Sequence, residues 1–184
     1  MRHTSLAIVL LSALFASAAQ AIPWNIRFVA IGGGIGPPSW EFGSNGAHGR
    51  SGVPLDYAVD VVTIGIGPRL GNWRLALGPK LMENFATQND PDANLVSPLY
   101  LTVCRDPAGT SRLMPKLDGY VGLNPWNLDA YVNAGVGAHW SFWGFEPGVS
   151  VSIRHAFSEE AWTDFISLRA TVNLGAWFDL GRRK

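Results

Sequence analysis

The second half of the chain alternates between apolar and polar residues with a period of two. Residues 131–138, 145–154 and 168–174 each place Val, Ala, Ile or Leu at one parity and mostly Gly, Ser, Asn, Thr or charged residues at the other. Successive side chains of a β-strand point to opposite faces, so this pattern predicts strands with one apolar and one polar face. The function then depends on which of the two faces meets the surroundings.

The alternation, extended along the chain, predicts eight strands joined by turns and loops. The segments Leu70-Gly71-Asn72 and Asp106-Pro107-Ala108-Gly109 have compositions typical of tight turns. Short strands and short connections without helical periodicity favour an all-β, antiparallel, up-and-down barrel. The predicted strands are Trp24–Gly34, Leu55–Gly67, Trp73–Phe85, Leu95–Cys104, Lys116–Leu123, Asn127–His139, Gly144–Ala156 and Phe165–Asp179.

The first 21 residues have the pattern of a secretory signal peptide. Arg2 and His3 begin the segment, residues 6–19 are apolar or small, and Ala19-Gln20-Ala21 is a small-x-small cleavage site. The apolar run is shorter than a membrane-spanning helix requires. We therefore expect residues 1–21 to be removed and residues 22–184 to form one domain outside the cytoplasm.

Composition narrows the possible partners and cofactors. Lys plus Arg and Asp plus Glu each number 14, so no basic surface for nucleic acid is expected. Cys104 is the only cysteine, which excludes an intrachain disulfide and a thiolate metal site. The histidines after residue 21 are His48, His139 and His155, and no two of them have metal-ligand spacing. We expect no metal and no cofactor.

The polar parity of the strands carries a thin, nearly balanced set of charges. A soluble barrel would turn these charges outward, whereas a membrane-spanning barrel would pair them inside and turn its apolar face to lipid. A solvated face normally carries several lysines and glutamates per strand, but the whole chain has only three lysines. This favours an interior charge network, whose predicted members are Arg27, Asp60, Arg74, Lys80, Asp118, Asp129, Glu146, Arg154 and Arg169.

The aromatic residues also favour a membrane. In an up-and-down barrel they fall at two rims, as the aromatic residues of membrane barrels do. One rim would hold Trp24, Trp73, Trp140, Trp143 and Phe178, and the other Tyr57, Phe85, Trp126, Phe157, Trp162 and Phe165.

The size of the predicted barrel also fits a membrane. Tilted strands of about 10 residues cross a bilayer, and eight strands close a barrel that its own side chains fill.

From residue 24 to residue 179 this architecture resembles the small outer-membrane β-barrel proteins of Gram-negative bacteria, of the OmpA, OmpX and OmpW kind. The resemblance implies a transmembrane barrel in the outer membrane, surrounded by outer-membrane lipid. A soluble periplasmic barrel similar to lipocalins, with the apolar face around a pocket, is the alternative from a different class. Its interior would have to hold eight stripes of bulky apolar residues, which overfill a small barrel.

One segment contains residue types found in hydrolases. His155, Ser158 and Glu159 lie close together in the chain, and a histidine between a serine and a carboxylate is a catalytic arrangement. The segment resembles lipid A 3-O-deacylases of the outer membrane, which carry Arg-His-x-Ser on a barrel strand. Here Ser158 is three residues from His155, so a strand would point the two side chains to opposite faces. An interfacial histidine beside a polar loop is the simpler interpretation.

The longest connection, residues 35–54, is the place where a surface ligand is most expected. Trp40, Phe42 and His48 lie in it, and binding residues concentrate on loops. The sequence therefore predicts a monomeric outer-membrane barrel with a structural or surface-interaction role and no open pore.

Overall fold

The computed structural model describes residues 22–44, 48–50, 55–85, 93–126, 128–157 and 162–180. The predicted signal peptide therefore lies outside the described residues. Every regular element in the described part of the chain is a strand. The strands are β1 (Trp24–Gly36), β2 (Trp40–Gly43), β3 (His48–Arg50), β4 (Asp56–Leu70), β5 (Trp73–Phe85), β6 (Ala93–Arg105), β7 (Leu113–Leu123), β8 (Ala130–Trp140), β9 (Phe145–Phe157) and β10 (Trp162–Leu180).

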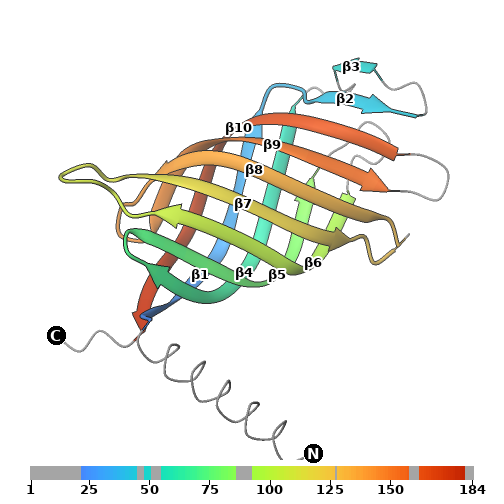
Figure 1. The fold of residues 1–184 in the computed structure, drawn as a ribbon. Coiled ribbons are helices and arrows are strands. Elements are labelled where there is room, and N and C mark those ends of the chain that lie inside the picture. Colours follow the sequence, from blue (N-terminus) through green and yellow to red (C-terminus); the bar gives the residue numbers. More distant parts are fainter. Residues whose placement is uncertain are drawn as a thin grey trace, which may run out of the picture.

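Eight of these strands close a barrel (Figure 1). Each strand from β4 to β9 pairs with the next one in the chain, and β1 pairs with both β4 and β10. All of these pairings are antiparallel. The prediction of an all-β, eight-stranded, antiparallel up-and-down barrel is confirmed.

Part of the long connection after β1 is a short β-hairpin, which corrects the expectation of a simple loop at residues 35–54. After Gly36 the chain turns through Pro37 and Pro38, and β2 continues along β10 through the pairs Trp40↔Ile166 to Gly43↔Thr163. Strand β3 then pairs with β2. We call the end of the barrel that carries β2 and β3 the hairpin rim, and the opposite end, where β1 begins and β10 ends, the terminal rim (Figure 1).

Most strand bounds lie within a few residues of the predicted ones. The largest differences are at the end of β4, which is Leu70, and at the beginnings of β7, β8 and β10, which are Leu113, Ala130 and Trp162. Asp129 therefore precedes β8 instead of facing the lumen from it, and its backbone carbonyl accepts a hydrogen bond from Asn124 N. The tight turn predicted before the third strand is present, since Gly71 and Asn72 connect the paired residues Leu70 and Trp73. Gly71 has a φ of 60°, which glycine adopts without steric cost.

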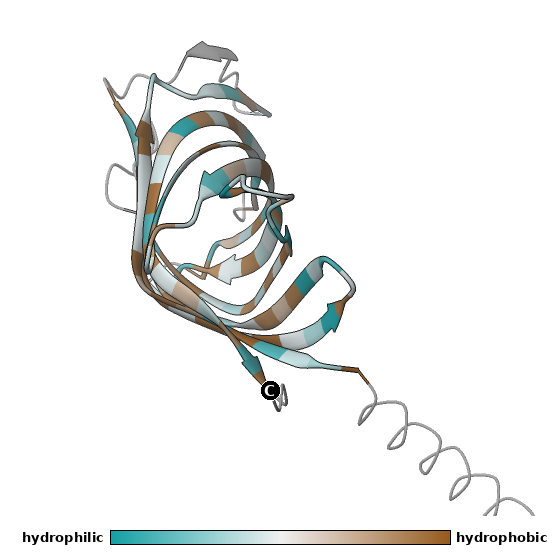
Figure 2. Ribbon diagram, turned by 90° about the vertical axis from the view of Figure 1, so that its left-hand side faces the viewer, coloured by the Kyte–Doolittle hydropathy of each residue, from teal (hydrophilic) through white to brown (hydrophobic). Residues whose placement is uncertain are grey.

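Hydrophilic and hydrophobic residues alternate along the strands of the barrel (Figure 2), and their burial shows that the two faces of the barrel differ sharply in polarity. On β9, Glu146 points into the lumen and is 1% exposed, whereas Val149, at the opposite parity, is 51% exposed on the outer face. The same contrast separates Arg169, at 8%, from Leu168, at 55%, on β10. The apolar face is therefore the outer one.

Irregularities in the four neighbouring strands β1, β4, β5 and β6 change the parity of the side chains that point inward. Val62 of β4 has a φ of 49°, and the pairing of β4 with β5 passes over it between Val61 and Thr63. On β5, Lys80 and Glu83 are both buried although their parities differ. A bulge adds one residue to a strand and exchanges its faces. Strict alternation therefore fails midway along these strands.

The structure corrects two sequence predictions. Phe85 and Phe165 were expected at an outer aromatic belt, but they are 0% and 7% exposed and face the lumen. The bulge in β5 accounts for Phe85, whereas Phe165 has the same inward parity as Arg169 on the regular strand β10. Asn84 has the same sequence parity as the inward Lys80, but after the bulge it lies on the face opposite to the buried Glu83 and Phe85. It donates from Nδ2 to Asn94 Oδ1 at 3.1 Å. Of the remaining predicted belt residues, Tyr57 is half-buried, and the others, Trp24, Trp73, Trp126, Trp140, Trp143, Phe157, Trp162 and Phe178, are exposed.

Candidate functional site

The lumen contains a network of buried ion pairs, with a central cluster halfway along it. Lys80 Nζ donates to Asp60 Oδ1 and to Glu83 Oε2, each at 3.1 Å. Arg154 donates from Nη2 to Glu83 Oε1 and from Nε to Tyr120 Oη at 2.9 Å. The cluster thus contains residues of β4, β5, β7 and β9, and its Glu83 carboxylate binds two cations, Lys80 and Arg154. Hydrogen bonds between ionised groups are stronger than neutral ones, so this cluster ties opposite walls together.

Further ion pairs lie on both sides of the central cluster. Toward the hairpin rim, Arg169 donates to both carboxylate oxygens of Asp56, at 2.7 and 3.1 Å. Toward the terminal rim, Arg27 makes a bidentate pair with Glu146, with 2.7 Å between Nη1 and Oε1. Each of these four side chains is buried. A buried ion pair is tolerated when geometry and additional hydrogen bonds compensate for the loss of water.

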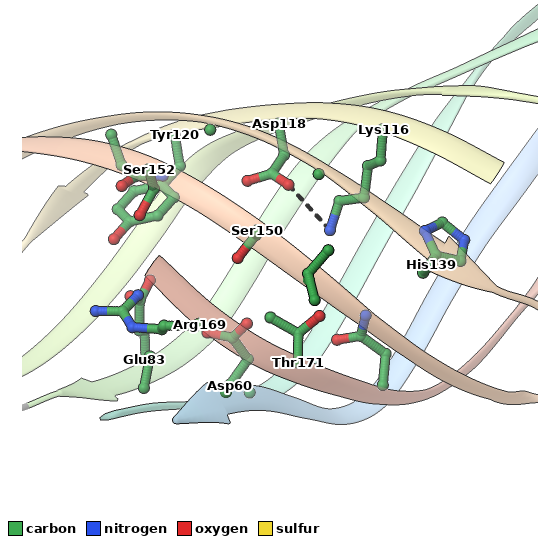
Figure 3. A pocket seen from close by; sticks show the side chains of 18 of the residues that line it. Asp60, Glu83, Lys116, Asp118, Tyr120, His139, Ser150, Ser152, Arg169 and Thr171 are labelled. Atoms are coloured by element: carbon green, nitrogen blue, oxygen red, sulfur yellow. Dashed lines mark ion pairs between the residues drawn. The ribbon is translucent and has the colours of Figure 1, made fainter. Parts of the chain in front are cut away.

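Lys116 and Asp118 of β7 form one more pair in the lumen, with 3.0 Å between Lys116 Nζ and Asp118 Oδ2 (Figure 3). Five cations in the lumen are then matched by five carboxylates. The cations are Arg27, Lys80, Lys116, Arg154 and Arg169, and their partners are Glu146, Asp60, Glu83, Asp118 and Asp56. The described interior is close to self-neutralised.

The terminal rim carries its own ion-pair cluster. Arg69 donates to Asp106 and to Asp179, the latter at 2.7 Å. Arg74 Nε donates to Asp106 Oδ1 at 2.5 Å, and its guanidinium lies 5.8 Å from the ring centre of Trp177. These residues come from β4, β5, the β6–β7 connection and β10. The cluster therefore joins the terminal-rim ends of β4, β5 and β10 to the β6–β7 connection.

Little free space remains in the lumen. A cavity of about 80 Å³ runs between the ion pairs and is lined by polar side chains from all parts of the wall (Figure 3). That volume holds a few water molecules. Toward the hairpin rim the lumen is filled by an apolar and aromatic cluster, in which the rings of Phe85 and Tyr131 meet edge to face at 5.6 Å. The remaining large buried members are Leu95, Tyr100 and Tyr120.

His139 is a buried side chain of the lumen that lies beside the ion pair of Arg27 and Glu146. It is 3% exposed, its Nε2 lies 3.9 Å from Glu146 Oε2, and neither ring nitrogen has a hydrogen-bond partner in the described part of the protein. It lines the lumenal cavity near Lys116 (Figure 3). Water in the cavity is the natural partner for these nitrogens.

Most of the predicted network residues point into the lumen. Arg27, Asp60, Lys80, Asp118, Glu146, Arg154 and Arg169 are in the pairs described above. Arg74 belongs to the terminal rim, and Asp129 lies in the β7–β8 connection. Sequence reasoning omitted Glu83 because the bulge in β5 reverses its parity. It also omitted Asp56 and Lys116 as members, although both share the parity of the predicted network residues on their strands.

The predicted hydrolase residues are described only in part. His155 is on β9, and its Nδ1 lies 2.6 Å from Oδ1 of Asp164 on β10. Asp164 was not predicted, because it fell within an expected connection. Ser158 and Glu159 lie outside the described residues. The structure thus supplies a carboxylate partner for His155 that differs from the predicted one.

The predicted ligand-binding residues lie at the hairpin rim. Trp40 and Phe42 of β2 are 49% and 38% exposed on its outer face. Only the backbone of His48 is described, as part of β3.

The described residues contain neither a candidate metal site nor a candidate membrane-spanning helix. No group of three or more His, Cys, Asp and Glu side chains in this part of the chain could hold a metal ion. Within the same residues, no helix has the length and apolar character needed to cross a membrane. Comparison of the chain with family models, curated proteins and solved structures found no match.

Proposed function

We propose that the chain is an outer-membrane β-barrel protein with a structural or surface-interaction role and without an open pore. The observation that carries this proposal is the inverted polarity of the barrel, whose ion pairs are inside and whose apolar residues are outside. Soluble monomers rarely expose a continuous apolar patch larger than a few hundred Å². Here exposed large apolar side chains occur on each of the eight barrel strands. A hydrocarbon environment accounts for this surface, and water does not.

The closed topology supports the same placement. In a bilayer every backbone donor and acceptor needs a partner within the protein, which a closed barrel supplies. Strand β1 pairs with both of its neighbours in the barrel, β4 and β10, so the cylinder has no open seam there. Exposed tryptophans lie at both rims, where amphipathic rings match the interface between lipid and water.

The proposed orientation places the terminal rim in the periplasm and the hairpin rim outside. Bacterial barrels of this type have short periplasmic turns and longer outer loops. At the terminal rim, Gly71 and Asn72 form the short β4–β5 turn, and Ser141–Gly144 joins β8 to β9. At the hairpin rim, residues 37–55 join β1 to β4. The protein would reach this site through the cleavable signal predicted at residues 1–21.

A filled lumen supports a role other than passive diffusion. The lumenal cavity of about 80 Å³ is too small for most solutes, and the apolar cluster around Phe85 narrows the path toward the hairpin rim. Eight-stranded barrels are generally filled by their own side chains. A monomer is sufficient for this arrangement, since all the pairings of the barrel are made within one chain.

Cell fractionation tests the proposal directly. After expression of the full chain in a Gram-negative host, we expect the protein in the outer-membrane fraction, soluble only in detergent and migrating faster on gels when unboiled. Val151→Arg should prevent insertion, because a cation on the lipid face near the bilayer centre costs about 2–4 kcal/mol. Val151→Leu is the matched control. Recovery of the wild-type protein as a soluble periplasmic species would overturn the proposal and favour the lipocalin-like alternative.

A further inference from the structure

A pair of polar side chains interrupts the apolar outer face near the hairpin rim. His155 of β9 and Asp164 of β10 are cross-strand partners at the outward parity, and both side chains are 32% exposed. Asp164 Oδ1 is bound to the imidazole Nδ1 at 2.6 Å. This contact leaves Nε2 and the second carboxylate oxygen without a partner among the described residues. The barrel therefore presents an acceptor-rich pair at the edge of its apolar surface.

Aromatic rings hold this pair in place. The ring of Phe157 meets the imidazole edge to face at 4.1 Å, and Trp162 lies nearly parallel to it at 5.9 Å, with an angle of 17° between the planes. Phe157 and Trp162 are themselves 48% and 44% exposed. Four side chains thus form a small, rigid, amphipathic surface. Rings with exposed faces beside hydrogen-bonding groups are a frequent basis of ligand recognition.

The outer face is hollowed next to this pair, on the side away from the hairpin rim. The pair Ile153↔Ile166 follows His155↔Asp164 on the same two strands and the same face. It lines a hollow of about 440 Å³, which is within the size range of ligand pockets. Strand β8 contributes the small residue Ala134 to its lining. Its lining side chains on the outer face are Leu117, Ala134, Val136, Val151, Ile153 and Ile166.

A second, smaller hollow continues this surface toward β2. It has a volume of about 160 Å³ and shares Val151 and Ile166 with the first. Pro37, Pro38 and Trp40 form its far wall. The two hollows together make an apolar groove that runs across β8, β9 and β10 beneath the polar pair. An elongated apolar groove with a polar pair beside it matches an amphiphile with a hydrocarbon chain.

We propose that this surface binds one glycolipid molecule, with an acyl chain in the groove and sugar hydroxyl groups on His155 and Asp164. Hydroxyl groups donate to a carboxylate and to the imidazole Nε2, and the C–H face of a sugar packs on the ring of Phe157. Arg154 and Arg169 of β9 and β10 point into the lumen and cannot pair with an anionic head group on the outer face. The outward carboxylate of Asp164 would repel such a head group, so the charges favour a head group with hydroxyl groups. This inference rests on the proposed membrane location.

Two amphiphiles with the same dodecyl chain but different heads test the proposal. The barrel, labelled with ¹⁵N-histidine, is reconstituted in phosphatidylcholine nanodiscs. It is titrated with dodecyl maltoside or with dodecylphosphocholine, whose head has no hydroxyl donors. We expect dodecyl maltoside to shift the His155 ring signals saturably, with an affinity about tenfold higher than that of dodecylphosphocholine. One hydrogen bond to a charged group accounts for that ratio.

Matched variants separate the head site from the groove. Asp164→Asn should abolish the preference for maltoside, whereas Asn84→Ala, in the outward pair of Asn84 and Asn94 near the same rim, should keep it. Ala134→Leu should fill the groove and weaken both amphiphiles, whereas Ala170→Leu, on the outer face of β10 away from the hollow, should not.

Four results would overturn the proposal. Equal affinity for the two heads would remove the sugar site, and unchanged binding by Ala134→Leu would remove the groove. A barrel that binds no dodecyl chain after correct insertion would refute the inference alone. A folded barrel that fails to enter nanodiscs would refute the membrane location, and this inference with it.

Discussion

Arg154 and Glu83 lie 71 residues apart in the chain and form an ion pair that crosses the lumen from β9 to β5. Tyr120 of β7 accepts two hydrogen bonds from the same guanidinium, at 2.9 and 2.7 Å. The guanidinium also lies 3.7 Å from the ring centre of Phe85. One buried cation thus joins three strands. It links the central cluster of ion pairs to the aromatic cluster that fills the lumen toward the hairpin rim.

A double-mutant cycle on this pair should show strong coupling. Glu83→Leu and Arg154→Leu each leave a buried charge without its main partner, and each should lower the free energy of unfolding by about 3–5 kcal/mol. The double variant removes both charges, so its loss should be smaller than the sum of the two. Urea titration of the folded barrel in detergent micelles measures all four proteins. Additive losses would show that the two side chains do not interact.

The reversed parity at Glu83 also shows where sequence reasoning stops. The period of two predicted the strands, the barrel and the inward direction of Arg27, Glu146 and Arg169, because alternation is a local property of each strand. It could not predict that Glu83 joins Lys80 inside, since the bulge in β5 arises from pairing with β4 and β6. Register between strands depends on contacts that a single strand does not contain.

The outer polar pair and the hairpin were missed for related reasons. Asp164 fell in an expected connection, because the predicted strand began at Phe165. In the structure β10 begins at Trp162, and this end of the strand pairs with β2. Strand β2 itself is only four residues long and follows a segment rich in glycine and proline. Such short strands form because a long neighbouring strand offers free backbone groups, and this is a tertiary effect.

Cys104 gives a chemical test of the inward face. Its side chain is buried on β6, so its thiol should resist a water-soluble maleimide in the folded barrel and react after unfolding. With Cys104→Ser as background, Leu77→Cys places a thiol on the outer face of β5, where the wild-type leucine is 47% exposed. That thiol should react with a lipid-soluble maleimide in the folded protein. Rapid labelling of Cys104 in the native barrel would contradict the assignment of its face.

Trp143 combines full exposure with an unfavourable backbone conformation. It is 99% exposed in the turn between β8 and β9, with a φ of 51°. A left-handed conformation costs a residue other than glycine roughly 1–2 kcal/mol. Trp143→Gly should therefore stabilise the barrel by about 1 kcal/mol in detergent, where the indole makes little contact with the protein.

In a bilayer the same substitution should give less stabilisation, because the interfacial contact of the indole is lost. Comparison of unfolding free energies in micelles and in vesicles measures the difference. Trp73→Gly is the control, since Trp73 belongs to the extended strand β5, and its replacement should destabilise the barrel in both media. Equal gains for Trp143→Gly in the two media would show that the indole does not anchor the protein at an interface.

The aromatic cluster predicts a closed lumen that two substitutions can open. Phe85 and Tyr131 are 0% and 5% exposed, and their contact fills the lumen near the hairpin rim. The wild-type barrel should show no steady conductance in a planar bilayer, whereas Phe85→Ala combined with Tyr131→Ala should produce discrete current steps. Phe157→Ala is the matched control, because this ring lies at the same rim but on the outer face, and its loss should leave the bilayer silent. The double variant should also lose several kcal/mol of stability, as large-to-small changes of buried rings do, so its folding is checked first by gel mobility. Steady currents through the wild-type protein would show that the cavity between the ion pairs is continuous with both rims.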